Sequence, residues 1–374
     1  MLISILKEIS SNETRVASTP DSVKLLIKFG AKIFVEKDAG FRSGYLNEEY
    51  ISAGAKIVER IECLHQGDIC LTVRMPPVKD IYKLKTGCIL IGMLNPYQNK
   101  NLFHELNKQK ITSCCLELLP RISRAQNMDV LSSQSNLSGY RSVIDAAEQF
   151  SKAFPMMMTA AGRINPAKVM ILGVGVAGLQ AIATARRLGA VVCATDVRLA
   201  TKEQVESLGA KFIMVEDEES KQAETSAGYA KEMSDEYKNK QFQLLVKTIS
   251  KQDIVICTAL IPGKTAPVLI TAEMIETMTP GSVIVDLAVE AGGNCTLSKV
   301  GEIVSYKGVK ILGYDNVPGR VAKDASSLYA KNIVNFLTLI IGNKDQKIII
   351  DWEDEIINAV VFTHDGNLKL EQFK

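Results

Sequence analysis

A glycine-rich turn is the first group of residues whose types and spacing fit a specific chemistry. Gly173, Gly175 and Gly178 follow the apolar segment KVMIL, and a helix-periodic apolar segment comes directly after them. Glycines at this spacing allow a sharp turn from a strand into a helix, and they let the backbone approach a pyrophosphate. The first N–H groups of such a helix carry a partial positive charge that attracts phosphate. The pattern therefore indicates a dinucleotide-binding turn.

The end of the next apolar segment narrows the choice of dinucleotide. Asp196 ends AVVCATD, at about the spacing of 20 residues that is typical after such a turn. A carboxylate there accepts hydrogen bonds from the adenosine ribose and repels a 2′-phosphate, so we expect NAD(H) in preference to NADP(H). Arg198, two residues later, weakens this expectation. We also expect Val176, Ala177 and Val197 to be among the cofactor-binding residues.

A polar segment, residues 120–136, offers a second set of groups. Arg121, Gln126, Asp129 and Ser132 can together hydrogen-bond a carboxamide and a ribose. A solvated surface loop is the simpler interpretation of such a composition. However, the segment joins two predicted domains, and clefts between domains commonly hold ligands. We therefore expect these residues to hold the nicotinamide end of the dinucleotide.

The elements that must position these groups alternate between strands and helices. Such alternation is typical of an α/β fold with parallel sheets. In the first part of the chain, apolar segments predict strands at 2–6, 31–36, 68–73, 88–94 and 111–118. In the second, strands are predicted around KVMIL and AVVCAT and at 211–215, 253–259, 281–288 and 309–313.

These segments predict two Rossmann-like, doubly wound parallel-sheet domains with an NAD(H) cleft between them. The first domain is discontinuous: it comprises 1–138 and 320–374 and is closed by the C-terminal helix. The second domain comprises 139–319, and a helix at 140–154 connects the two. Strand-like segments are expected at 347–353 and 360–366. The charged segment 216–240 is expected to be an exposed loop, because long polar segments inside a compact domain usually are.

Composition excludes several other classes of protein. The 44 basic and 42 acidic side chains nearly cancel, which argues against a nucleic-acid partner. No apolar segment approaches the length of about 18 residues that a membrane span needs. The eight cysteines form no C-x-x-C pair and the three histidines are scattered, so we expect reduced core thiols and no metal site. The chain is expected to be cytoplasmic.

Several long segments then identify a family resemblance. PRISRAQNMDVLSSQSNLSGYR, FPMMMTAAG, GVGVAGLQAIATARRLGA, AGYAKEM, ALIPGK and VDLAVEAGGNC together resemble the NAD(H)-binding component of proton-translocating transhydrogenase. The resemblance implies that Arg121, Gln126, Asp129 and Ser132 grip the nicotinamide and its ribose. It also implies a mobile loop that closes over bound nucleotide. Further cofactor contacts are then expected from Gly228, Tyr229, Ala259, Leu260 and Glu290.

The resemblance also implies a reaction and a set of partners. Hydride passes directly between NADH on this chain and NADP(H) on a partner component, so the protein must align two rings rather than move a proton. A membrane-embedded proton-channel subunit and an NADP(H)-binding subunit are the implied partners. Family members of this kind form homodimers, and this chain would associate peripherally with the inner membrane through those subunits.

Two alternatives remain at this stage. Alanine dehydrogenase shares part of this sequence, but its chemistry needs a proton-transfer group and cations for a carboxylate. Arg15 matches that family's arginine, whereas Thr72, Met93 and Glu290 stand where it has lysine, histidine and aspartate; Arg74 could supply a second cation. A non-catalytic, redox-sensing NAD module is the other alternative. The crowded ring-binding segment argues against it, because sensing needs only the adenosine half.

Overall fold

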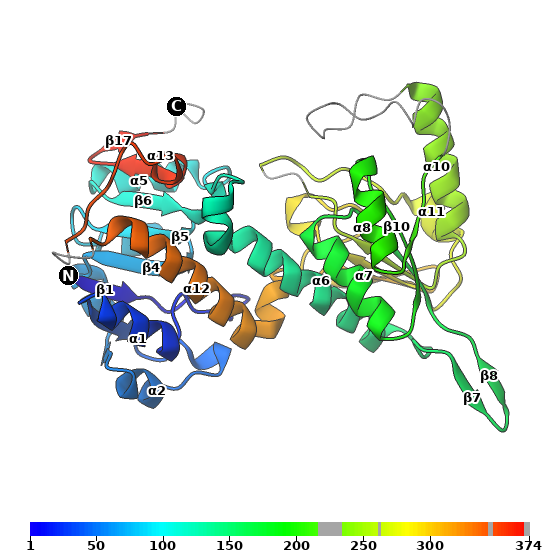
Figure 1. Ribbon diagram of the computed structural model, residues 1–374, viewed down its shortest axis with the longest axis horizontal. Coiled ribbons are helices and arrows are strands. Elements are labelled where there is room, and N and C mark those ends of the chain that lie inside the picture. Colours follow the sequence, from blue (N-terminus) through cyan, green and yellow to red (C-terminus); the bar gives the residue numbers. More distant parts are fainter. Residues whose placement is uncertain (216–233, 261–262, 343–346, 370–374) are drawn as a thin grey trace. The chain divides into compact units, whose positions relative to one another are not determined.

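The computed structural model describes residues 1–215, 234–260, 263–342 and 347–369 (Figure 1). It divides into two compact units, one formed by Met1–Gln134 with Pro318–Lys374 and the other by Ser135–Val317. The first unit is therefore assembled from both ends of the chain. Gly228 and Tyr229, expected in a loop over the nucleotide, lie outside the described residues.

The first unit contains an eight-stranded sheet in the order β17-β16-β6-β5-β4-β1-β2-β3. Strands β1 to β6 pair in parallel, whereas β16 and β17 form an antiparallel edge. The strands are β1 (Leu2–Ile5), β2 (Lys32–Glu36), β3 (Lys56–Val58), β4 (Ile69–Arg74), β5 (Ile89–Met93), β6 (Thr112–Cys115), β16 (Val361–His364) and β17 (Asn367–Leu368).

Helices cover both faces of this sheet and give it two apolar cores (Figure 1). Val23 and Tyr329 pack on one face, and Leu64 and Phe103 pack on the other. Burial on both faces explains why these strands read as nearly continuous apolar runs. The helical elements are α1 (Pro20–Lys28), η1 (Phe41–Ser43), α2 (Asn47–Ser52), α3 (Arg60–Gln66), α4 (Val78–Ile81), α5 (Lys100–Lys108), η2 (Leu116–Leu118), η3 (Ser123–Met128), η6 (Val317–Val321), α12 (Ala322–Ile340) and α13 (Glu355–Val360).

The second unit contains a seven-stranded sheet in the order β11-β10-β9-β12-β13-β15-β14. Only β14 runs antiparallel to its neighbour within this described sheet. The strands are β9 (Lys168–Leu172), β10 (Val191–Thr195), β11 (Lys211–Phe212), β12 (Ile254–Cys257), β13 (Val283–Asp286), β14 (Ile303–Tyr306) and β15 (Val309–Leu312), and β7 (Met157–Thr159) pairs with β8 (Gly162–Ile164) as a separate hairpin.

Helices again cover both faces of the sheet. Ile182 and Val143 pack on one face, and Ile249 and Met274 pack on the other. Both units are thus α/β folds with mixed, mainly parallel sheets, as expected from the alternation of segments. The helical elements are α6 (Val130–Gln149), α7 (Val176–Arg187), η4 (Leu199–Thr201), α8 (Lys202–Ser207), α10 (Asp235–Ile249), α11 (Ala272–Glu276) and η5 (Val289–Ala291).

Three local expectations were wrong. Helix α6 begins at Val130, ahead of the expected start at 140, and the segment expected to be a loop up to 240 becomes helical at Asp235. The segment 347–353 forms only an isolated bridge between Ile348 and Ile341 within its described part. The parallel sheets are confirmed, with antiparallel strands added at their edges.

Within the residues that the structure describes, no helix has the length and apolarity to cross a bilayer.

Candidate functional site

The glycine-rich turn of the second unit connects β9 to α7. Gly173 has a φ of +93°, in the left-handed region that favours glycine. A Cβ at Gly178 would lie 2.0 Å from the carbonyl oxygen of Gly173, so only glycine lets the helix approach the strand this closely. A Cβ at Gly175 would meet open space, with nothing within 4 Å. The backbone at Gly175 is thus accessible to a bulky group such as a pyrophosphate.

The N-terminus of α7 suits an anion. Gly175 is its N-cap and supplies no side chain to cap the helix, and the first turn contains no acidic residue. Because the first N–H groups of a helix lack intrahelical acceptors, those of Val176, Ala177 and Gly178 are suited to phosphate oxygens. The turn also lies where the strand order reverses, between β9 and β12, and open α/β sheets bind ligands at such a switch point.

Asp196 follows β10 and is tightly held. Its Oδ2 accepts the N–H of Val174 at 2.7 Å, and its Oδ1 accepts the N–H of Arg198 at 2.8 Å. The Arg198 guanidinium donates to both carboxylate oxygens, at 2.9 Å each. Burial alone would raise the pKa of Asp196, but these hydrogen bonds and the positive charge of Arg198 hold its pKa below the usual value. The carboxylate is therefore charged and available to accept ribose hydroxyls.

Apolar side chains surround this edge of the sheet. Val197 is 83% exposed and Leu260 is 54% exposed, which is unusual for residues beside buried strands. Val176 is also exposed. An adenine or nicotinamide ring is flat and apolar on its faces, so exposed aliphatic side chains here are suited to cover one.

Sequence reasoning missed two residues that shape this edge. Thr258 donates its hydroxyl to the carbonyl oxygen of Gly173 at 2.8 Å, which ties β12 to the glycine turn. Asn294 is fully buried, accepts the N–H of Ala259 at 3.1 Å and donates to the carbonyl oxygens of Ala259 and Pro267. Both lie far in sequence from their partners, so no local pattern could reveal them.

The polar segment of the first unit forms η3 and the start of α6. Asp129 accepts the N–H and the hydroxyl of Ser132 at 2.9 and 2.5 Å, so it caps the N-terminus of α6. This cap explains why the helix begins earlier than expected. Arg121 and Gln126 are exposed, and no side-chain hydrogen bond or ion pair holds either one within the described part of the chain. Of the four expected ring-binding residues, two are thus engaged in a cap and two project freely.

Comparison with known proteins shows where this chain belongs. Family models described as the N-terminal and C-terminal domains of alanine dehydrogenase/PNT match residues 4–138 and 142–371. The chain is 53% identical over 372 residues to an NAD(P) transhydrogenase subunit alpha polypeptide of Rhodospirillum rubrum, covering 98% of this chain and 97% of that protein. The chain belongs to the NAD(P) transhydrogenase alpha-subunit family.

Further comparisons support the same family. The crystal structure of transhydrogenase from Sinorhizobium meliloti matches with a TM-score of 0.91 and 47% identity, covering 98% of this chain and 100% of that one. Alanine dehydrogenase of Methanococcus maripaludis is 30% identical over 359 residues, covering 93% of this chain and 89% of that protein. The resemblance to transhydrogenase is confirmed, and NAD(H) binding is consistent with the family and with the turn geometry.

Within this alpha-subunit chain, the alanine dehydrogenase positions Arg15, Thr72 and Met93 lie in the first unit, with Thr72 and Met93 near the carboxyl ends of β4 and β5. Arg15 is buried, with its guanidinium bonded to both oxygens of Glu13 at 2.7 and 2.6 Å and to Gln134 at 2.8 Å. Arg74 also donates to Glu13, at 3.0 Å. Desolvation opposes ionisation of Glu13, but these two arginines lower its pKa to about 2. Both cations therefore face a permanent carboxylate of the chain itself.

Of the remaining alanine dehydrogenase positions, Thr72 and Met93 carry no side chain that can act as an acid or base, whereas Glu290 carries a carboxylate. The Thr72 hydroxyl lies 2.9 Å from Oε1 of buried Glu8 and 2.6 Å from the carbonyl oxygen of Arg74. Met93 ends β5 and is partly buried. Glu290 lies in η5 of the second unit, where its carboxylate accepts the N–H of Asn316 at 3.3 Å.

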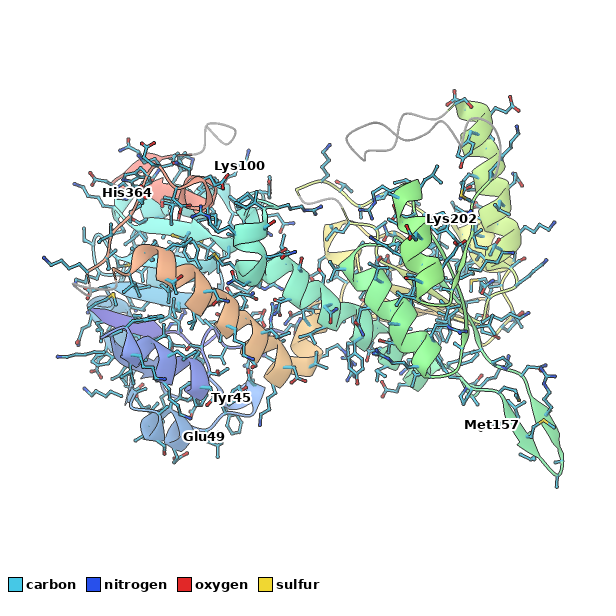
Figure 2. All side chains as sticks on the ribbon, in the orientation of Figure 1. Tyr45, Glu49, Lys100, Met157, Lys202 and His364 are labelled. Atoms are coloured by element: carbon cyan, nitrogen blue, oxygen red, sulfur yellow. The ribbon has the colours of Figure 1, made fainter. Side chains whose placement is uncertain are left out.

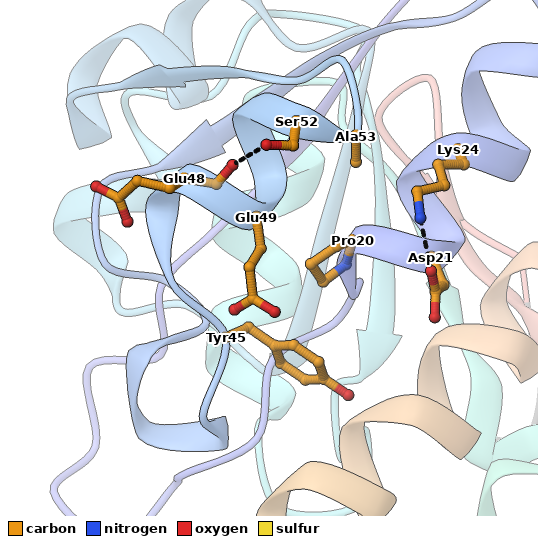
Figure 3. Close-up of a pocket in the computed structure, with 8 residues that line it drawn as sticks. All are labelled: Pro20, Asp21, Lys24, Tyr45, Glu48, Glu49, Ser52 and Ala53. Carbon is orange, nitrogen blue, oxygen red and sulfur yellow. Dashed lines mark hydrogen bonds and ion pairs between the residues drawn. The ribbon is translucent and has the colours of Figure 1, made fainter.

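A pocket, possible metal ligands and the cysteines are the other features of the described residues that could bear on function. A surface hollow of about 400 Å³ lies between α1 and α2 (Figure 3), and no expected site residue lines it. Among the described residues, no cluster of three or more His, Cys, Asp or Glu is placed to hold a metal ion. The cysteines are free thiols, and burial raises the pKa of Cys114 to about 12 and that of Cys193 to about 11, so these two thiols stay protonated.

Proposed function

We propose that this chain is the NAD(H)-binding component of a proton-translocating transhydrogenase and transfers hydride between NADH and NADP⁺ bound on a partner component. The observation that carries the proposal is the complete dinucleotide turn of the second unit, in a chain that belongs to the transhydrogenase alpha-subunit family. In the first unit, the side chains of Arg121 and Gln126 are exposed and unpaired within the described residues. NADH, when bound, supplies a hydride from C4 of its dihydronicotinamide ring.

Each group has a separate role in the proposal. The N-terminus of α7 binds the pyrophosphate, and Asp196 accepts the ribose hydroxyls. Gln126 hydrogen-bonds the carboxamide, Arg121 donates to the ribose and ring, and Asp129 with Ser132 fixes the loop and contributes acceptors. These groups orient the ring and exclude water from it. Hydride transfer between two C4 atoms requires alignment, and no proton is exchanged with the protein in that step.

The partners follow from the reaction. NADP(H) sits on an NADP(H)-binding subunit, and a membrane-embedded subunit carries the proton, so this chain is a peripheral part of a membrane complex.

We further propose a homodimer. The β7–β8 hairpin, on which Figure 2 labels Met157, supports it: every residue of both strands is exposed, and apolar Met157 and Met158 are 40% and 70% exposed. An isolated apolar hairpin is marginally stable in water, so it is suited to burial against a second copy.

The decisive experiment mixes the full chain with the NADP(H)-binding component of a transhydrogenase. Reduction of an NAD analogue by NADPH is then followed spectroscopically. We expect turnover only when both proteins are present, because each contributes one nucleotide. Absence of turnover despite nucleotide binding to both proteins contradicts the proposed function.

The same preparation is assayed with alanine and NAD⁺ as a control for the rival activity. We expect no deamination, because Glu13 already pairs with the buried cation Arg15 and Thr72 can supply no charge. Robust deamination by the isolated chain would instead identify an amino-acid dehydrogenase.

A further inference from the structure

The loop that presents Arg121 and Gln126 is held by residues about 200 positions later in the chain. Asn332 and Asn335 of α12 both donate to the carbonyl oxygen of Asn127, at 2.8 and 2.9 Å. A single backbone oxygen of η3 therefore receives two amide donors from one helix. This arrangement fixes both the position and the direction of the peptide group.

The same helix also fixes the start of α6. Asn332 accepts the hydroxyl of Ser133 at 2.8 Å through its Oδ1 while its Nδ2 holds Asn127. Asn332 is 7% exposed, and its amide is engaged at both ends. It thus sets the spacing between η3 and the first turn of α6, where the cap formed by Asp129 and Ser132 lies.

A second support comes from the C-terminal segment. Arg124 donates two parallel hydrogen bonds to Asp354, at 2.7 Å each. Such bidentate pairs have a fixed geometry in addition to their charge. Asp354 is itself fixed, because its Oδ1 caps α13 by accepting the N–H of Ile356 at 2.8 Å. Arg124 is 50% exposed, so the pair contributes little to stability and mainly sets orientation.

Burial of the loop does not depend on these polar contacts. Ala125 and Met128 are 1% and 4% exposed and anchor η3 in the apolar core of the first unit. The apolar anchors therefore keep the loop on the unit, whereas the polar contacts decide which way its exposed side chains point. Small errors in that direction are costly for a reaction that depends on alignment.

We propose that Asn332, Asn335 and the Arg124–Asp354 pair are positioning residues for hydride transfer, holding the loop so that Arg121 and Gln126 meet the nicotinamide. This inference rests on the proposed function. It predicts that residues of the C-terminal segment control the rate of hydride transfer without controlling the affinity for NADH.

The test uses the full-length variant N335A/D354N in the mixed assay with the NADP(H) component. Asn at 354 keeps an oxygen for the α13 cap but loses the charge that pairs with Arg124. We expect the rate of hydride transfer at saturating NADH to fall about tenfold, the Kd for NADH to stay within about twofold, and the backbone amides of 121–129 to exchange hydrogen for deuterium faster. The control K24Q removes the exposed Lys24–Asp21 pair of the same unit and should leave all three unchanged.

Three outcomes of this experiment would overturn the proposed positioning role. Unchanged exchange in 121–129, or faster exchange with an unchanged transfer rate, overturns the inference. A loss of NADH affinity equal to the loss of rate also overturns it, because alignment alone would spare binding. Failure of the wild-type mixture to transfer hydride overturns the proposed function instead, while the exchange rates still show whether these contacts hold the loop.

Discussion

The carboxylate of Asp196 already has hydrogen-bond partners within the chain, and a bound dinucleotide would add another. Its carboxylate stabilises the glycine turn through the N–H of Val174 and pairs with Arg198. Under the proposed function, a ribose hydroxyl shares Asp196 with the Arg198 contacts or displaces them, because both carboxylate oxygens already accept hydrogen bonds. The pairing holds the Arg198 guanidinium against the carboxylate, and this limits the ability of Arg198 to attract a 2′-phosphate. We therefore propose that cofactor preference depends on the Asp196–Arg198 pair rather than on Asp196 alone.

Replacing Asp196 tests this directly. D196A should weaken NADH binding about tenfold or more, because hydrogen bonds to a charged acceptor are lost, and it should release Arg198 toward a 2′-phosphate. The ratio of NADPH to NADH affinity should therefore rise. Isothermal titration with both nucleotides measures it. Equal binding of NADPH and NADH by the unaltered chain would show that the cofactor assignment is wrong.

A matching test concerns Gln126, which is proposed to bind the nicotinamide end of the dinucleotide. Its side chain is exposed and unpaired within the described residues, so Q126A should leave the stability of the first unit unchanged. We expect hydride transfer to slow by at least tenfold while NADH affinity changes little, because orientation is lost but most contacts remain. Single-turnover kinetics separate the two quantities. An unaltered rate would remove Gln126 from the mechanism.

At the scale of elements, two glycines of the strand–turn–helix unit are expected to have different roles: Gly178 in folding and Gly175 in binding. A Cβ at Gly178 collides with backbone, whereas a Cβ at Gly175 enters open space and that residue has a negative φ of −86° that any residue can adopt. Gly178 is therefore required by packing, and we propose that Gly175 is required by the approach of the ligand.

The pair G178A and G175A should accordingly behave differently. We expect G178A to lower the free energy of unfolding by about 2 kcal/mol, because overpacking against backbone forces the helix away from the strand. G175A should unfold like the unaltered chain but bind NADH at least tenfold more weakly, because its methyl group occupies the space needed for the pyrophosphate. Thermal melts and titration on both variants check this. Equal stability loss in both would contradict the division of roles.

A second feature at the scale of elements is the buried carboxyl group of Glu8, near the ends of β1 and β4. Burial raises the pKa of Glu8 to about 7 from its usual value of 4.5, and the nearby charge of Glu13 adds to this despite the N–H of Val73. Because the folded-state pKa is raised, the contribution of Glu8 to stability is fully present below about pH 4.5 and is lost as pH rises through 7.

The variant E8Q should remove that pH dependence. Gln keeps the acceptor oxygen used by Thr72 but cannot ionise. We expect the free energy of unfolding of E8Q minus that of the unaltered chain to rise between pH 5 and pH 7.5, by about 2 kcal/mol. Urea titrations at the two pH values measure the difference. A constant difference would show that Glu8 is ionised throughout.

At the scale of the whole molecule, association remains a prediction that depends on the β7–β8 hairpin. Met158 is the most exposed of its methionines, and a charge there would oppose burial against any apolar partner. M158D should shift the chain from dimer to monomer in sedimentation velocity runs, without changing its thermal stability as a monomer. The control V268D places the same charge at another exposed apolar residue of the unit. A dimer that survives M158D but not V268D would locate the contact elsewhere.

The sequence by itself determined the α/β class, most of the parallel strands and the dinucleotide turn. Each of these depends on short-range patterns: apolar runs long enough for a buried strand, and glycine spacing that reports a local turn. Family membership was also accessible, because segments such as the one containing Arg121 and Gln126 are long and distinctive.

Only the tertiary structure decided which distant residues meet. The start of α6 depends on a cap between Asp129 and Ser132 that a polar composition concealed. The clamp of Asn294 on Ala259 and the donation from Asn335 to Asn127 join segments that share no local pattern. Such contacts arise because both ends of the chain fold into one unit and because parallel strands bring distant loops to one edge, and neither arrangement leaves a periodic signal in the sequence.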